Sequence, residues 1–281
     1  MKKLVLTLFT LCCIGISFSQ IKTPQPSPSS TLKQTVGITE ITVNYSRPGA
    51  KDRTIFGELV PYNKIWRTGA NKATAITFKS DVIFGETKVK KGTYSLFTVP
   101  GESEWVVMLN KETELWGAGN YNKENEVASF KVDTKKTSDF TESFTIDFNT
   151  FTAFGAMMNL TWENTQVSVP VMTYGKEKLA EQFKKELVDG PDAGLFYNGA
   201  RFYLDNDLDI NLALEWITVA TEKRPEAFWM LYQQARNLDK AGSKKEAIQA
   251  AQKVISIASE KEDDYGYIAR AENLIKELTS K

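Results

Sequence analysis

The sequence predicts a two-part α+β protein, in which an antiparallel β-sandwich or jelly-roll-like domain precedes an α-helical domain. Between residues 31 and 172, apolar residues recur mostly at every second position, as in strands with one buried face. From residue 173 to residue 281 they recur at the three- and four-residue spacing of helices. The chain has 281 residues, 42% of them hydrophobic and 25% charged, which is a globular composition.

The N-terminal residues 1–19 have the layout of a secretory signal peptide. Two lysines precede an apolar run over residues 4–18, and two serines stand two positions apart just before Gln20. The run is shorter than the roughly 20 apolar residues of a comfortable membrane span. We therefore expect an exported protein, with the periplasm favoured over release, whose mature chain lacks Cys12, Cys13 and any membrane span.

Residues 20–30 are rich in proline and serine, so we expect an extended linker before the folded part. In the β-domain, residues 31–172, we expect about nine or ten short strands separated by turn-forming residues. These are Arg47-Pro48-Gly49, Phe84-Gly85-Glu86, Lys91-Gly92, Pro100-Gly101-Glu102 and Glu163-Asn164. Because no helix-length periodic segment falls between the strands, an antiparallel arrangement is favoured over β-α-β winding. Continuous apolar runs at 105–109 and 156–160 indicate strands that are more fully buried.

The helical domain, residues 173–281, contains about six predicted helices and a repeat of 34 residues. Ala213, Ile217 and Ala220 recur 34 positions later as Ala247, Ala251 and Val254. This spacing resembles two tetratricopeptide units followed by a capping helix, although Arg201 stands where a small residue is usual. A plain helical bundle without a peptide groove is the alternative. Since about three units are usually needed for independent stability, we expect the helices to pack against the β-domain.

The segment between Tyr45 and Thr77 is the most specialised part of the sequence. The alternation of apolar residues lapses there, and three of the seven arginines fall within it. Planar guanidinium groups suit bidentate recognition of a carboxylate or phosphate, and aromatic rings suit sugar faces. The candidate ligand-binding residues are Arg47, Arg53, Tyr62, Trp66, Arg67, Asn71 and, from a separate loop, Trp116. The alternative is that the guanidiniums tie this segment to backbone carbonyls or to Asp52 or Glu58.

A string of residues within this segment is similar to the hallmark of a known family. The hallmark RP...R-x-I-F-G...L-V-P-Y...W-R-T-G-A-N-x-A-T runs over residues 47–74, and KKGTYSLFTVPGESEWVVMLNK follows at residues 90–111. Residues 27–171 thereby resemble the DUF2911 family of secreted Bacteroidota-type proteins. The resemblance implies export and a β-fold, and it transfers no catalytic role.

Charge and composition exclude several classes of function. The 35 basic and 35 acidic residues balance, so nucleic acid is not an expected partner. The absence of histidine removes Ser-His-Asp, Cys-His and His-ligated zinc chemistry. The acidic residues also lack the pattern of a calcium-binding loop. We therefore assign no catalytic residue, no metal and no cofactor.

The leading hypothesis is an exported, non-enzymatic binding module of the cell envelope that grips an anionic glycan or peptide through the arginine- and aromatic-rich segment. A second hypothesis is a structural or interaction protein that binds an envelope partner through its tetratricopeptide-like helices. A carboxylate-based glycoside hydrolase, using Glu58 with Asp52 or Glu112 with Glu114, is the least favoured.

Overall fold

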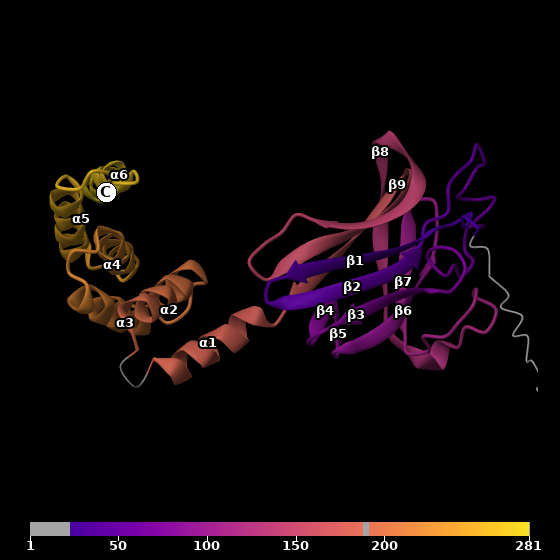
Figure 1. Ribbon diagram of the computed structural model, residues 1–281, viewed down its shortest axis with the longest axis horizontal. Helices are drawn as coiled ribbons and strands as arrows, with labels where there is room; N and C mark the ends of the chain where they lie inside the picture. The colour runs from indigo at the N-terminus through magenta and orange to yellow at the C-terminus, as the bar shows by residue number, and fades with distance from the viewer. Residues whose placement is uncertain (1–22, 188–190, 281) are drawn as a thin grey trace, which may run out of the picture.

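The computed structural model describes residues 23–187 and 191–280 of the chain. The predicted signal peptide, residues 1–19, lies outside these residues. Within them, nine antiparallel strands are followed by six α-helices, which confirms the two-part α+β layout (Figure 1). No helix in the described ranges combines the length and apolar character needed to cross a bilayer.

The strands form one sheet in the order β1-β2-β3-β6-β7-β8-β9-β4-β5. Their bounds are β1 (Ser29–Val36), β2 (Thr39–Ser46), β3 (Thr74–Phe78), β4 (Val82–Phe84), β5 (Thr87–Val89), β6 (Gly92–Val99), β7 (Glu104–Asn110), β8 (Glu126–Asn149) and β9 (Gly155–Thr173). A short 3₁₀ helix, η1 (Lys123–Asn125), precedes β8. Because Ser29 already pairs with Ser46, the last two residues of the segment expected to be a linker belong to the sheet.

The sheet folds over a single core because β8 passes from one layer to the other. Residues 126–133 of β8 pair with β7, and residues 134–149 pair with β9. Across the core, the Tyr45 hydroxyl on β2 accepts a hydrogen bond from the Ile146 amide on β8 at 3.1 Å. The rings of Phe78 on β3 and Phe84 on β4 lie 5.9 Å apart. The result is a sandwich-like domain built from one continuous sheet.

Strands β8 and β9 are much longer than predicted, with 24 and 19 residues. The turn expected at Glu163-Asn164 is wrong, because β9 continues through it. Glu163 adopts a φ of +49° and pairs with Thr141, while the register shifts between Lys136 and Thr141. The Asn164 side chain donates to the Thr137 carbonyl at 3.2 Å. A bulge thus absorbs the turn-forming residues without ending the ladder.

Strands β6 and β7 are buried on both faces, which accounts for the continuous apolar run at 105–109. On the inner face, Trp105 packs in the main core. On the outer face, Phe97 and Met108 form a second cluster that the loop over residues 111–125 covers. Within this cluster the Phe97 ring meets the Tyr121 ring at 4.8 Å.

The six helices are α1 (Gly175–Glu186), α2 (Ala193–Asp205), α3 (Ile210–Lys223), α4 (Phe228–Lys240), α5 (Lys244–Ala258) and α6 (Tyr267–Ser280). Helices α2 and α3 correspond to the first predicted unit, α4 and α5 to the second, and α6 to the capping helix. The repeated residues Ala213, Ile217, Ala220, Ala247, Ala251 and Val254 are all fully buried. Small side chains at these positions let paired helices approach closely.

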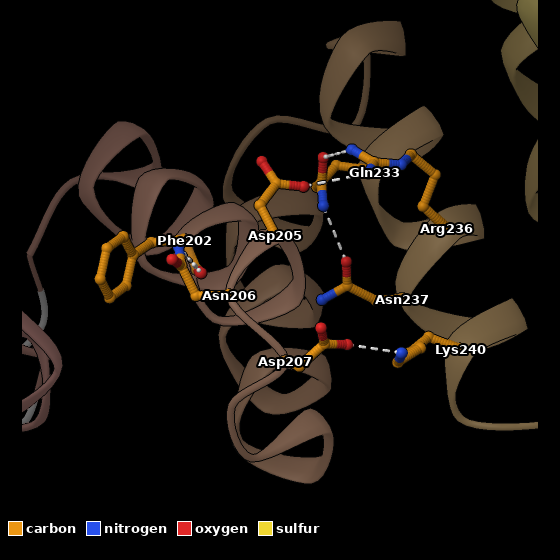
Figure 2. A network of polar contacts seen from close by, with 8 residues as sticks. All are labelled: Phe202, Asp205, Asn206, Asp207, Gln233, Arg236, Asn237 and Lys240. Atoms are coloured by element: carbon orange, nitrogen blue, oxygen red, sulfur yellow. Dashed lines mark hydrogen bonds and ion pairs between the residues drawn. The ribbon is translucent and has the colours of Figure 1, made fainter. Parts of the chain in front are cut away.

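A polar seam separates the two helical units, each of which has its own apolar cluster. Figure 2 shows the polar side chains that meet there, which include Asp205, Asp207, Gln233, Arg236, Asn237 and Lys240. Arg236 Nη2 donates to Asp205 Oδ1 at 3.0 Å, and Lys240 Nζ donates to Asp207 Oδ1 at 2.6 Å. Gln233 and Asn237 are buried and hydrogen-bond to each other at 2.9 Å. These contacts link the end of α2 to α4.

The helical region meets the sheet at the β8–β9 turn, and α1 follows β9 almost directly (Figure 1). The Phe154 ring of this turn packs edge-on against Phe202 of α2, with centroids 6.0 Å apart. Other aromatic residues of α2 pack inside the helical region instead, as where Tyr203 meets Trp216 at 4.7 Å. The first helical unit therefore has a core of its own and touches the sheet at its margin.

Candidate functional site

Arg47 and Arg53, two of the predicted ligand-binding residues, donate hydrogen bonds inside the protein. Arg47 Nε donates to the Phe144 carbonyl at 3.1 Å, and its Nη2 donates to Thr145 Oγ1 at 2.7 Å. Arg53 donates to the backbone carbonyls three and four residues before it, at 2.9 and 2.7 Å. Both side chains thus follow the alternative interpretation, in which guanidiniums hold the segment in place.

The aromatic residues of the segment pack into the core of the sheet. Trp66 is 8% exposed, stacks on Trp162 at 5.9 Å, and donates from Nε1 to the Gly69 carbonyl at 3.0 Å. Its backbone also exchanges hydrogen bonds with Thr98 on β6 at 2.7 and 2.9 Å. Tyr62 is partly buried against the same core. Both rings help to order the segment, and the faces of Trp66 are occupied by other core residues.

Asn71 holds the end of the segment against the beginning of the domain. Its φ is +60°, a left-handed conformation that asparagine tolerates better than most residues. Its Nδ2 donates to Ser46 Oγ at 3.2 Å and to the Ser27 carbonyl at 3.4 Å. Asn71 therefore has a structural role in this arrangement.

Arg67 and Trp116 differ from the other candidates. Arg67 Nε is buried and has no hydrogen-bond partner among the described residues, and burial lowers the pKa of the guanidinium. Trp116 is 76% exposed, as expected for this loop. The backbone near Arg67 and the backbone near Trp116 both hydrogen-bond to residues 73 and 74. The Ala73 amide donates to the carbonyl of Leu115, the residue before Trp116, and the Thr74 amide donates to the Arg67 carbonyl. Of the seven predicted residues, these two have side chains that the fold leaves without an evident structural partner in the described ranges.

The carboxylates of Glu112 and Glu114 both make contacts within the protein. The Glu114 carboxylate forms an ion pair with Lys72 Nζ at 2.8 Å. The hydrogen bond from this lysine lowers the pKa of Glu114. The carboxylate of Glu112 accepts a hydrogen bond from the Glu114 amide at 3.0 Å. These contacts order the start of the loop over residues 111–125 and connect it to Lys72.

A group of lysines gathers elsewhere, around two adjoining hollows of about 400 and 420 Å³ that share Asp81 and Tyr174. We call them together the lysine hollow. Its lysines are Lys79, Lys88, Lys90, Lys91 and Lys178. Sequence reasoning missed this site because the residues are spread from position 79 to position 178. The run KVKK at residues 88–91 was the one local signal.

Four segments of the fold bring these lysines together: the β3–β4 turn, β5, the β5–β6 turn and the beginning of α1. Asp81 fixes two of these segments relative to each other. Its carboxylate accepts from Lys90 Nζ at 2.8 Å and from the Lys91 amide at 2.9 Å. The hydrogen bond from the Lys90 side chain, followed by the one from the Lys91 amide, lowers the pKa of Asp81. Asp81 thereby neutralises Lys90, and the remaining lysines make no ion pair within the described residues.

Helix α1 begins inside the lysine hollow and adds to its positive potential. Tyr174 precedes the helix and provides no side-chain cap for it among the described contacts. The first backbone N–H groups of a helix carry partial positive charge and favour anions nearby. Because the chain as a whole has no net charge, the five lysines and this helix end form a local field.

Among the described residues, no group of three or more His, Cys, Asp or Glu side chains is arranged to hold a metal ion. A family model with the description "Protein of unknown function (DUF2911)" matches residues 27–171, just over half of the chain. The match covers the sheet almost completely and ends before α1. A search among curated proteins found no match.

Proposed function

The chain belongs to the DUF2911 family, and from that premise we propose that it is an exported, non-enzymatic binding module of the cell envelope that holds an anionic glycan or peptide in the lysine hollow. The observation that carries this proposal is the gathering of five lysines around a single aspartate, in a chain with equal numbers of acidic and basic residues. Such a local positive field attracts anionic ligands.

The chemistry of the hollow favours a ligand with several negative groups. Lysine ammonium groups are point charges on flexible stems, and they suit distributed charges better than one precisely oriented carboxylate. Because the two hollows adjoin at Asp81 and Tyr174, we place one extended ligand across both. The guanidiniums of Arg47 and Arg53, which would suit a single bidentate anion, already bind internal acceptors. We therefore place the ligand at the lysines.

Export is part of the proposal and rests on the layout of residues 1–19. Mass spectrometry of the protein recovered from a periplasmic fraction tests it directly. We expect a mature chain that begins near Gln20. A full-length chain that stays in the cytoplasm would contradict export without bearing on the hollow.

Isothermal titration of the mature chain with hexagalacturonate and with hexaglutamate tests the site. We expect binding to at least one of them, weaker at about 0.3 M than at about 0.05 M salt because exposed charges are screened. The double variant Lys88→Gln/Lys91→Gln should weaken binding by about tenfold, since each exposed ionic contact contributes up to about 1 kcal/mol.

The control removes two lysines from another part of the same domain. Lys135 and Lys136 are exposed on β8, so the variant Lys135→Gln/Lys136→Gln changes the net charge equally. We expect it to bind like the unaltered protein. The proposal fails if both double variants lose the same affinity, or if the unaltered protein binds neither hexamer.

A further inference from the structure

The second helical unit carries a separate hollow of about 790 Å³ at the end where α4 begins. The α3–α4 turn contributes Glu226, the first turn of α4 contributes Trp229, and the α5–α6 loop contributes Lys261, Glu262, Asp263 and Tyr265. We call it the aromatic hollow. The ion pairs that join α4 to the end of α2 and the residue after it come from its other half, from Arg236 and Lys240 (Figure 2).

Two aromatic side chains project from the walls of this hollow into solvent. Trp229 is 36% exposed and Tyr265 is 69% exposed. Beneath them Phe228, at 5% exposure, packs edge-on against Trp229 with ring centroids 5.3 Å apart. Folding therefore anchors one side of Trp229 and leaves accessible ring surface on both residues. Exposed aromatic rings gathered around a concavity are characteristic of binding surfaces.

The loop holds Tyr265 in an unusual conformation. Its φ is +49°, a left-handed value that is rare for a bulky residue. The Asp263 carboxylate accepts a hydrogen bond from the Tyr265 amide at 2.7 Å. Next to it, the Asp264 carboxylate caps α6 by accepting from the Ile268 amide at 2.9 Å. The tyrosine is thus presented by a structured turn, so its backbone loses little freedom on binding a partner.

The charge of the aromatic hollow is predominantly negative. Three carboxylates, those of Glu226, Glu262 and Asp263, line it together with a single cation, Lys261. Glu226 and Glu262 form neither ion pairs nor side-chain hydrogen bonds with the described residues, so their oxygens remain open to a ligand. The faces of tryptophan and tyrosine also attract cations through their π electrons. The rings and the carboxylates of the aromatic hollow therefore both favour a cationic group.

We propose that the aromatic hollow binds a lysine- or arginine-rich segment of a partner protein. A cationic side chain of that segment lies against the rings of Trp229 and Tyr265, with its charge near Glu226 and Glu262. This inference is independent of the lysine hollow, which takes ligands of the opposite charge. It gives the helical region a partner of defined chemistry.

Fluorescence anisotropy of the full mature chain with a labelled Gly-Lys-Gly-Arg repeat peptide tests the proposal. The variant Glu226→Gln/Glu262→Gln should weaken binding by about tenfold. Tyr265→Asn keeps a residue that tolerates positive φ and removes the ring, so we expect a loss of about two- to fivefold. The control Glu272→Gln/Glu277→Gln removes two exposed carboxylates from α6 and should leave affinity unchanged.

Three outcomes would overturn the proposal. The unaltered protein fails to bind the peptide, or the α6 control weakens binding as much as the double variant in the hollow. The third is that maltohexaose, a neutral sugar, binds in a Tyr265-dependent way while the peptide does not, which would assign the rings to a glycan. Circular dichroism of each variant, unchanged from the unaltered protein, ensures that a loss of binding reports on the hollow.

Discussion

The substitution Arg47→Met separates a structural role from a ligand-binding role for the arginine-rich segment. Methionine keeps much of the side-chain stem and removes both donors, those to the Phe144 carbonyl and to Thr145 Oγ1. A hydrogen bond from a charged group contributes about 1.5–3 kcal/mol, and the half-buried position of Arg47 places each at the lower end. We therefore expect the free energy of unfolding to fall by about 2–4 kcal/mol.

Urea denaturation followed by tryptophan fluorescence measures this loss, because Trp66, Trp105 and Trp162 lie buried together in the core of the sheet. The matched control is Arg53→Met. Arg53 also makes two hydrogen bonds, but it is exposed and its acceptors are only three and four residues away, so we expect a loss below about 1 kcal/mol. Equal losses for the two variants, or a larger loss for Arg53, would refute the assignment of Arg47 as the tie between the segment and β8.

Two further predictions concern the turn after β4 and the cap of α6. Gly85→Ala, at a φ of +61°, places a Cβ in steric conflict with the Phe130 ring, and we expect a loss of about 2–4 kcal/mol in urea unfolding. Gly117→Ala, at a φ of +85° with no described atom within 4 Å of the new Cβ, should cost only about 1–2 kcal/mol; similar losses for both would contradict the clash. Hydrogen bonds from backbone amides, chiefly that of Ile268, lower the pKa of Asp264. The ionised cap therefore stabilises α6 fully at pH values above the ordinary aspartate pKa of about 3.9. This contribution is lost as the pH falls through the lowered pKa. Asp264→Asn should flatten the pH dependence of helical melting below about pH 4, and an unchanged dependence by circular dichroism would argue against the cap.

Much of the fold was predictable because periodicity is a local property of the chain. Spacing of two up to Met172 and helical spacing from Gly175 predicted the order of strands and helices that the structure has. The repeat through Ala213 and Ala247 also identified fully buried positions in α3 and α5. The lengths of β8 and β9 were not predictable in this way, because the bulge at Glu163 depends on how two distant strands align.

The candidate sites were harder to predict, since a side chain's role depends on its partners. Arg47 is equally suited to a ligand or to an internal acceptor, and only the fold brings it to the carbonyl of Phe144, 97 positions away. Lys178 lies at the beginning of α1 and reaches the lysine hollow only because β9 ends beside the β3–β4 turn. Sequence spacing carries no information about such convergence.

The sequence by itself determined the order of strands and helices and many of the positions that they bury, because these follow from the order of apolar, polar and turn-forming residues. Only the tertiary structure decided which charges are satisfied internally and which gather at a surface. The physical reason is that electrostatic and hydrogen-bond energies depend on distances in space, and these are set by the packing of the sheet and the helices.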